Sequence, residues 1–247
     1  MIKSSCDRTL LSSDHTMIRN AAHASVRNRA FSRKNHFHGE KGRTMEEKLA
    51  WTELRTEHII QDEWIDFRKS SFRYPDGRVF EPFYSYSRRN YTVIVASDEE
   101  GRYLCVRQYR QGIRQVTTEF PAGGIERISG KEYGSNEYIE TALEAAKREL
   151  AEETGYVSDD WEHLLTVPSN ATLADNYASV FRAKNCRKES EQNLDETEVL
   201  TVKKISAEEI EALIHNGEFQ QAVHVMAWLL AKDTEKDSGR MTENEAL

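Results

Sequence analysis

Three glutamates in the second half of the chain constrain the fold most. Glu149, Glu152 and Glu153 stand at spacings that place them on one face of a helix. Like charges at these spacings destabilise a helix by roughly a few tenths of a kcal/mol per pair, and the helix dipole disfavours anions near its C-terminal end. One explanation is a solvated acidic face. The other is a bound cation, for which carboxylate oxygens suit hard ions such as Mg²⁺ or Mn²⁺.

The surrounding residues predict an amphipathic helix over residues 136–153. Ser135 or Asn136 is expected to cap its start, and Gly155 stands where a helix C-terminus favours a left-handed residue. Apolar residues recur at steps of four, three and four. They are Ile139, Leu143, Ala146 and Leu150.

Further residues stand at fixed offsets around the three glutamates. Gly134 is followed after five residues by Glu140, and after seven more by an Arg-Glu-Leu-Ala-Glu-Glu-Thr-Gly-Tyr run that begins at Arg148. This signature segment, residues 134–156, resembles the Nudix signature G-x5-E-x7-R-E-U-x-E-E-x-G-U at every defined position, where U is apolar. The resemblance implies a Nudix fold, an α/β/α sandwich with a mixed β-sheet. It also implies metal-dependent hydrolysis of a nucleoside diphosphate linked to another group.

The same resemblance implies a role for each residue of the signature segment. Glu149 and Glu153 would be the main metal ligands, with Glu152 ligating or assisting and all three taking part in catalysis. The supporting residues, which hold the helix in place, would be Gly134, Glu140, Arg148 and Gly155.

Two upstream segments are similar to the ADP-ribose pyrophosphatase branch of the family. They are Gln108-Tyr109-Arg110 and the run from Glu119 to Gly124, Glu-Phe-Pro-Ala-Gly-Gly. The similarity implies that the Ala122 carbonyl ligates a metal, that Arg110 contacts the diphosphate, and that Glu119 lies beside the substrate. The alternative for the second segment is an ordinary strand that ends in a turn. Ile128 to Tyr133 resembles an insertion near the site entrance.

Downstream, the similarity suggests a general base. Glu198 matches a glutamate that precedes an apolar strand in the animal ADP-sugar hydrolases, and Asp175 is the reserve candidate in a Pro/Asn-rich loop. In the same relatives, aromatic residues of an N-terminal hairpin sandwich the adenine, often across a dimer, and Trp64 and Phe80 match them by local pattern. The alternatives are a surface glutamate for Glu198 and core packing for the two aromatic residues.

The remaining pattern predicts a β-rich first half. Residues 64–68 and 79–86 alternate around the turn at residues 74–78, which predicts an N-terminal β-hairpin. Further strands are expected at residues 91–96, 103–109, 164–167, 177–183 and 199–205. A capping-box spacing from Ser206 predicts a helix, and a last helix is expected over about residues 220–232, before a polar, frayed tail.

Charge and cysteine usage bound the rest. Residues 1–44 hold nine Lys or Arg against three Asp or Glu, whereas the whole chain carries −8. They are interpreted as a disordered arm, or as sequence upstream of a start at Met45, with a transit peptide as the weaker reading. Cys6, Cys105 and Cys186 form no CxxC pair, which favours a reducing cytoplasm. The net charge argues against nucleic-acid binding, and no apolar run is long enough to span a membrane.

These observations together predict an N-terminal β-rich subdomain over 45–90, a Nudix domain over 91–232 and a tail over 233–247. The expected reaction is Mg²⁺-dependent hydrolysis of ADP-ribose or a related nucleoside diphosphate sugar to AMP and a sugar phosphate, with Mn²⁺ as a possible substitute. The alternatives are another NDP-sugar such as GDP-mannose or ADP-glucose, a dinucleotide, a non-catalytic ADP-ribose-binding sensor, or a purely structural acidic domain. A cytoplasmic homodimer is expected.

Overall fold

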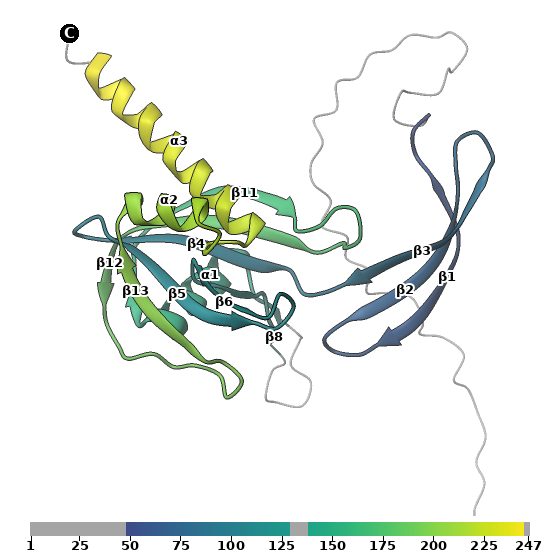
Figure 1. Ribbon diagram of the computed structural model, residues 1–247, viewed down its shortest axis with the longest axis horizontal. Helices are drawn as coiled ribbons and strands as arrows, with labels where there is room; N and C mark the ends of the chain where they lie inside the picture. Colours follow the sequence, from purple (N-terminus) through teal and green to yellow (C-terminus); the bar gives the residue numbers. More distant parts are fainter. Residues whose placement is uncertain (1–47, 129–137, 245–247) are drawn as a thin grey trace, which may run out of the picture. The chain divides into compact units, whose positions relative to one another are not determined.

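The computed structural model describes residues 48–128 and 138–244 (Figure 1). The predicted arm over residues 1–44, the glycine at 134, the cap candidates at 135 and 136, and most of the expected insertion lie outside this range. Within the described residues, no helix is both long and apolar enough to cross a bilayer.

The first strands form a separate three-stranded antiparallel sheet. It consists of β1 (Thr52–Gln61), β2 (Asp66–Arg73) and β3 (Val79–Ser87), in that order. The predicted hairpin is confirmed as β2–β3. Its turn contains Gly77 at a φ of 92°, and the Asp76 carboxylate accepts a hydrogen bond from the Arg78 backbone N–H at 3.0 Å. The expected strand start at Trp64 is wrong, because Trp64 lies in the β1–β2 turn.

The second sheet is mixed and has eight strands. Its main path runs β10-β12-β4-β5-β13, with β11 on β12, β6 on β5 and β7 on β4. Only the β12–β4 pair is parallel among these pairs of the described chain. The strands are β4 (Tyr91–Asp98), β5 (Tyr103–Arg110), β6 (Gln115–Glu119), β7 (Ala122–Gly124), β10 (Tyr156–Val157), β11 (Asp160–Pro168), β12 (Tyr177–Lys188) and β13 (Leu200–Ile205).

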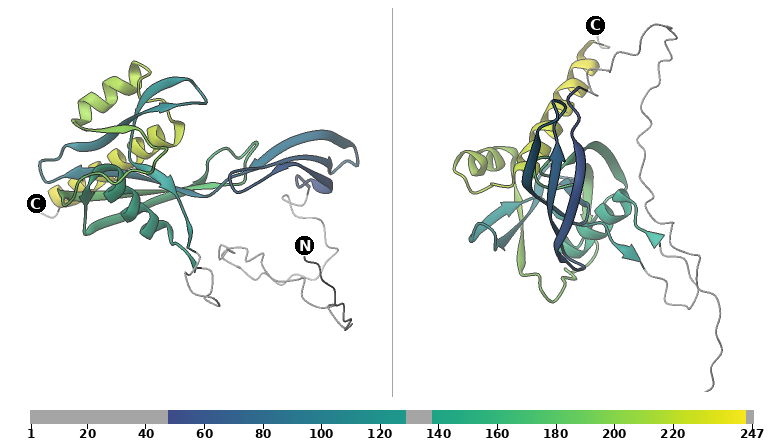
Figure 2. Two further views of the ribbon diagram at one scale, coloured as in Figure 1. Left: turned by 90° about the horizontal axis from the view of Figure 1, so that it is seen from below. Right: turned by 90° about the vertical axis from the view of Figure 1, so that its right-hand side faces the viewer.

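Side chains alternate across the central strand β4 and build two cores, one on each face of this sheet. Val93 and Val95 pack on the face covered by α2 (Ala207–His215) and α3 (Ala222–Asn244) (Figure 2). Ile94 and Ala96 pack on the opposite face, together with residues of α1 (Ala142–Thr154). This arrangement confirms the expected α/β/α sandwich around a mixed sheet.

Helix α1 begins later than the sequence pattern predicts. Thr141 is its N-cap: its side chain accepts a hydrogen bond from the Glu144 N–H at 3.2 Å, and the Glu144 carboxylate accepts one from the Thr141 N–H at 2.8 Å. Residues 138–139 instead form β9 (Tyr138–Ile139), which pairs with β8 (Arg127–Ile128). The predicted start at 136 is therefore wrong, because a complete capping box defines the start at 141.

Two helix ends agree with the sequence predictions, and a third lies further along the chain than expected. Gly155 ends α1 in the left-handed conformation, with φ 73°, as predicted. Ser206 caps α2 with the predicted capping box. Helix α3 continues to Asn244, so the expectation of a frayed tail from residue 233 is wrong for the residues up to 244.

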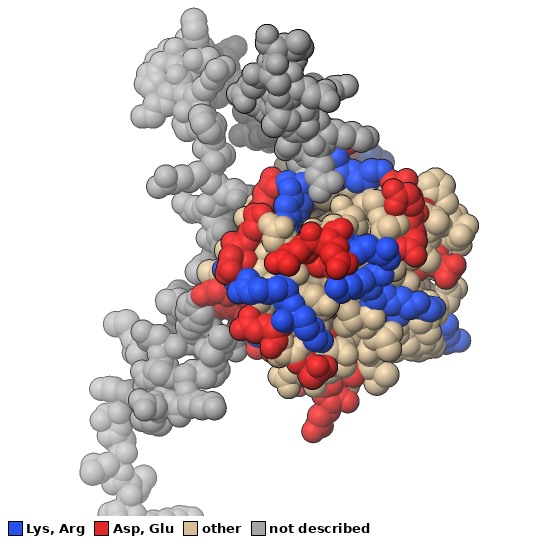
Figure 3. Space-filling view, turned by 90° about the vertical axis from the view of Figure 1, so that its left-hand side faces the viewer, with Lys and Arg blue, Asp and Glu red and all other residues tan. Residues whose placement is uncertain are grey.

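The charged side chains on one described face are intermixed. Figure 3 shows Lys and Arg beside Asp and Glu across this face of the described residues. This face therefore does not present the uniformly basic surface that general nucleic-acid binders use.

Candidate active site

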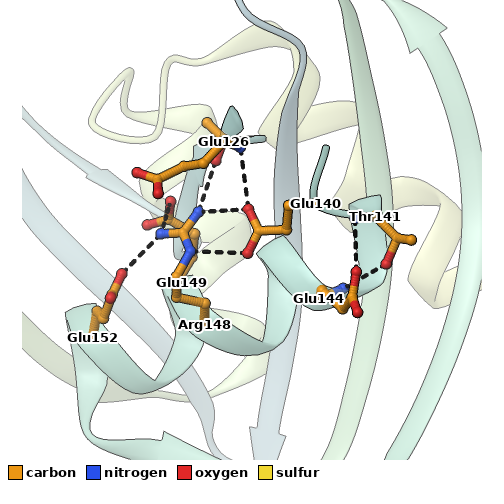
Figure 4. A network of polar contacts seen from close by, with 8 residues as sticks. Glu126, Glu140, Thr141, Glu144, Arg148, Glu149 and Glu152 are labelled. Atoms are coloured by element: carbon orange, nitrogen blue, oxygen red, sulfur yellow. Dashed lines mark hydrogen bonds and ion pairs between the residues drawn. The ribbon is translucent and has the colours of Figure 1, made fainter. Parts of the chain in front are cut away.

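Arg148 lies at the centre of a carboxylate network on α1 (Figure 4). Its Nε and Nη2 donate to the two carboxylate oxygens of Glu140, both at 3.0 Å. Its Nη1 donates to Glu149 at 2.8 Å and to Glu152 at 2.9 Å. Nη2 also donates to the Gly124 carbonyl at 2.9 Å, which ties α1 to strand β7. The guanidinium therefore sets the orientation of the helix face that carries the glutamates.

Glu149 is held against the backbone of β7. A Cβ atom added to Gly123 would lie 1.9–2.2 Å from the carboxylate atoms of Glu149, so the carboxylate occupies the space that any side chain at 123 would fill. Burial raises the pKa of Glu149 to about 7; Arg148 offsets part of this rise, while Glu152 and Glu198 add to it. Glu149 is thus a buried carboxylate with incomplete charge compensation.

Glu153 lies one turn further along the same face and is almost fully buried. Its Oε2 accepts a hydrogen bond from the Ala122 N–H at 3.0 Å. Burial raises the pKa of Glu153, and the charges of Glu149 and Glu198 raise it further. The predicted ligand positions on α1 and β7 are therefore brought together.

The oxygen donors at this site are of the chemical type that divalent cations prefer. Among the described residues, no group of three or more His, Cys, Asp or Glu side chains is placed so that it could hold a metal ion as it stands. The reason is visible in the contacts, because Arg148 engages Glu149 and Glu152 while the Ala122 N–H engages Glu153. Burial is the main cause of the raised pKa values of Glu149 and Glu153, and neighbouring carboxylates add to it. Carboxylate and carbonyl oxygens are the hard donors that Mg²⁺ and Mn²⁺ prefer.

A second ion pair joins the ends of β5 and β6. Arg110 Nε lies 2.9 and 3.0 Å from the two Glu119 oxygens, and Nη2 lies 2.5 Å from Oε2. The Thr117 hydroxyl also donates to Glu119. Burial alone would raise the pKa of Glu119, but Arg110 outweighs it and lowers the pKa. The fully buried Glu119 therefore fixes Arg110, whose side chain stays about one third exposed.

These parts border one cavity of about 670 Å³. It is lined by side chains of the signature segment, by β7, by the β1–β2 turn and by the loop before β13. The predicted site residues among its lining are Trp64, Arg110, Ala122, Arg148, Glu149, Glu152 and Glu198. Glu119 and Glu153 lie beneath this lining and contact members of it.

The two candidate bases are placed differently. Glu198 lines the cavity within a turn, where its N–H donates to the Asp195 carbonyl at 2.9 Å. Asp175 is not among the lining residues. Its Oδ2 instead accepts hydrogen bonds from Ser87 at 2.6 Å and Arg68 at 3.1 Å. Glu198 thus lies at the cavity, where its Oε2 accepts a hydrogen bond from the Asp195 N–H at 3.3 Å, whereas Asp175 is engaged with β2 and the end of β3.

The two predicted aromatic residues are also placed differently. Trp64 borders the cavity with 64% of its surface exposed, and the Arg89 guanidinium lies 5.7 Å from its ring centroid. Phe80 does not line this cavity. It packs instead near Trp51 and Phe83, in an aromatic cluster on the three-stranded sheet.

The sequence pattern did not single out several residues of this cavity. Arg88, Arg89, Tyr86 and Tyr91 line it, and so does His224 at the start of α3. An Arg-Arg pair directly after a strand is a readable signal for an anion site. His224 gave no comparable signal, since a lone histidine in an apolar helix resembles ordinary core packing.

Known proteins resemble this chain across the same region. The NUDIX domain family matches residues 87–229. An ADP-ribose pyrophosphatase of Bacillus subtilis (strain 168) is 27% identical over 187 residues, covering 73% of this chain and 89% of the relative. A methanol dehydrogenase activator of Bacillus methanolicus is 27% identical over 175 residues, covering 68% of this chain and 83% of the relative.

A solved structure agrees in fold. The crystal structure of an ADP compounds hydrolase superposes with a TM-score of 0.62 at 22% identity, covering 78% of this chain and 98% of that one. The sandwich and the signature helix thus occur together with a family match over more than half of the chain. The chain belongs to the NUDIX domain family and is a Nudix pyrophosphohydrolase.

Proposed function

We propose that the protein hydrolyses the diphosphate bond of ADP-ribose, or of a related nucleoside diphosphate sugar, with Mg²⁺. The single observation that carries this proposal is the shared cavity of about 670 Å³, in which Glu149 and Glu152 lie with Arg110 and the exposed Trp64. Carboxylates, a fixed guanidinium and an aromatic face suit a metal, a diphosphate and a base. The names of the B. subtilis relative and of the structural neighbour support the same substrate class.

Glu149, Glu152, Glu153 and the Ala122 carbonyl would hold the metal. Bound there, Mg²⁺, or Mn²⁺ in its place, supplies positive charge that offsets the charge developing on the diphosphate during cleavage. Glu140 and Arg148 keep α1 against β7 and so maintain the spacing between these donors.

The remaining residues act on substrate and water. Arg110 orients the phosphates through charge-assisted hydrogen bonds, and Trp64 stacks on the base for about 1–3 kcal/mol. Water attacks one phosphorus while Glu198 accepts its proton. The bond from that phosphorus to the bridging oxygen breaks, and the products from ADP-ribose are AMP and ribose 5-phosphate.

The direct test mixes purified protein with ADP-ribose and Mg²⁺ and quantifies AMP. Glu153→Gln and Glu149→Gln should each lower kcat by at least about a hundredfold, since each removes a charged donor. Glu191→Gln is the matched control, because this carboxylate is 96% exposed. Release of AMP by Glu153→Gln at the wild-type rate would contradict the ligand assignment. A panel with GDP-mannose, ADP-glucose and a dinucleotide separates the alternative substrates, and binding without turnover would indicate a sensor.

We also propose a homodimer formed through the three-stranded sheet. Large apolar side chains are exposed on this sheet and directly before it, and exposed apolar surface can mark an interaction site. They include Trp51, Leu54, Ile60, Val79 and Tyr84. Light scattering on the purified chain tests the assembly, and a monomer mass at micromolar concentration would contradict it. A cytoplasmic location, and the division into a subdomain over 45–90 and a Nudix domain over 91–232, remain part of this proposal.

A further inference from the structure

His224 lies in the first turn of α3, and a backbone hydrogen bond determines which of its two ring nitrogens carries the proton. The residue is only 3% exposed, and its Nδ1 accepts a hydrogen bond from the Phe120 backbone N–H, with 3.2 Å between the two nitrogens. A nitrogen that accepts a hydrogen bond carries no proton, so a neutral ring must carry its proton on Nε2. The burial lowers the pKa of His224 to about 4, while Glu119 acts to raise it and Arg110 to lower it. The ring is therefore neutral near neutral pH and offers one N–H donor.

That donor has no partner in the described part of the chain. The hydrogen bond of the ring uses Nδ1, which faces the Phe120 backbone directly after β6. His224 also lines the cavity of about 670 Å³, together with Glu149 and Glu152 of the signature segment. Because Nδ1 is engaged, Nε2 is the polar atom that the ring can offer to a ligand in this cavity.

The start of α3 adds further donors to the same wall. The first backbone hydrogen bond of the helix runs from the Val225 N–H to the Gln221 carbonyl at 2.9 Å. The N–H groups of Ala222, Val223 and His224 precede it and are not used by the helix ladder. Ala222 and Val223 line the cavity, and the first turn holds no acidic residue. A helix N-terminus with free N–H groups favours an anion.

We propose that His224 Nε2–H, with the first turn of α3 and Arg110, binds a phosphate oxygen of the substrate. This set offers donors and positive potential, and the buried Glu119 carboxylate beside it is already paired with Arg110. His224 is thus a specificity-determining residue that selects a phosphate at this end of the cavity. The inference rests on the proposed function for the identity of the substrate, but the binding chemistry can be tested without turnover.

The first experiment reads the tautomer by ¹⁵N NMR of histidine-labelled protein at about pH 8, in EDTA and without metal. We expect His224 as the Nε2–H tautomer, assigned by loss of its signals in His224→Gln. His215 is the internal control, because its Nδ1 lies 2.7 Å from the Glu211 carbonyl and so carries a proton there. Ribose 5-phosphate and AMP should shift the His224 Nε2 signal, and inorganic phosphate should shift it less. An Nδ1–H tautomer, or an equal shift with sulfate, would overturn the proposal.

The second experiment separates binding from chemistry. His224→Leu should raise the KM for ADP-ribose about tenfold with a much smaller change in kcat, which corresponds to one lost hydrogen bond. His224→Gln, which keeps an acceptor and a donor, should recover most of the loss, and His215→Leu should leave both constants unchanged. A folded His224→Leu with wild-type KM would overturn the proposal. If His224→Leu does not fold, the His224→Gln kinetics and the NMR shifts decide the question. If the wild type releases no AMP, the proposed function fails, while the metal-free phosphate titration still decides the role of His224.

Discussion

Gly123 shows how one missing side chain positions a buried carboxylate. Gly123→Ala places a Cβ within about 2 Å of the Glu149 carboxylate, which must then swing away because it is the flexible end of a side chain. We expect kcat to fall at least about tenfold while the melting temperature changes little. Gly124→Ala is the matched control, since its Cβ would meet only the Arg89 Cδ at 3.9 Å. Equal activity in the two variants would show that the position of Glu149 does not matter.

Arg148 balances a buried charge, so its removal should be costly. Glu140 is 5% exposed in its side chain, and Arg148→Met leaves it without its counter-ion. We expect a loss of roughly 3 kcal/mol in the free energy of unfolding, measured by urea denaturation. Adding Glu140→Gln to that variant should recover part of the loss. Arg187→Met, where both partners are exposed by half or more, should change it by less than about 0.5 kcal/mol.

At the residue scale, the sequence was most informative where spacing alone fixes chemistry. Glu149 and Glu152 lie at one cavity because the helix repeat places them on one face, and Arg110, which the family resemblance suggested, lines the same cavity. Phe80 packs near Phe83 and does not line the cavity. Local sequence pattern could not predict this, because it does not show which neighbour an aromatic side chain packs against. His224 was missed because its partner, the Phe120 N–H, is distant in sequence.

At the element scale, the end of α1 can be tested as a tight junction. Gly155 has φ 73°, and a Cβ there would lie 2.1 Å from the Ser190 carbonyl oxygen, a backbone atom that cannot move cheaply. Gly101 has nearly the same φ, 74°, but open space around it. We expect Gly101→Ala to cost about 1 kcal/mol of unfolding free energy and Gly155→Ala clearly more, because only the second adds a collision. Equal losses would show that the helix end relaxes freely.

The ends of helices were predicted correctly where a capping residue lies within the same segment. They were predicted wrongly where strand pairing with a distant segment competes with the helix. Gly155 and Ser206 mark α1 and α2 correctly, because each cap satisfies its own helix. The start of α1 was placed too early because Ile139 fits the helical stripe yet pairs with Arg127 as a strand. This pairing depends on β8, and the apolar pattern of the helix contains no information about that strand.

The whole molecule assembles its cavity from segments that are far apart in the chain. The layered fold was predictable because the signature segment resembles that of a family with this fold. The side chains of β4 pack alternately into a core on each face of the sheet. The composition of the cavity was less predictable. Trp64, Arg110, Glu149 and His224 come from a turn, a strand end and two different helices, and only the tertiary fold brings them together.

The stability of the whole molecule should depend on pH through His224. Its pKa is about 4 in the folded chain and about 6.5 when unfolded, so the unfolded state binds more protons between these values. The contribution of the neutral ring is therefore complete above about pH 6.5 and is lost as the pH falls towards 4, by roughly 3 kcal/mol at most. Glu119, whose pKa is lowered, adds a further loss at more acidic pH. Glu149 and Glu153 act in the opposite direction, because raised carboxyl pKa values favour the folded state as the pH falls.

Comparing the unfolding free energies of wild type and His224→Gln separates the effect of the histidine from that of these carboxyl groups. The unfolding free energies of wild type and His224→Gln are measured by urea denaturation in metal-free buffer from about pH 7.5 to 4.5. Both proteins contain Glu149 and Glu153, so the difference between their free energies reports on position 224. We expect the advantage of the wild type to shrink steadily as the pH falls below 6.5, because the imidazole gains a proton on unfolding and the glutamine amide does not. His215→Gln, which replaces an exposed histidine, should track the wild type throughout. Parallel curves for wild type and His224→Gln would mean that the buried ring does not resist protonation, and the neutral donor at the cavity wall would lose its basis.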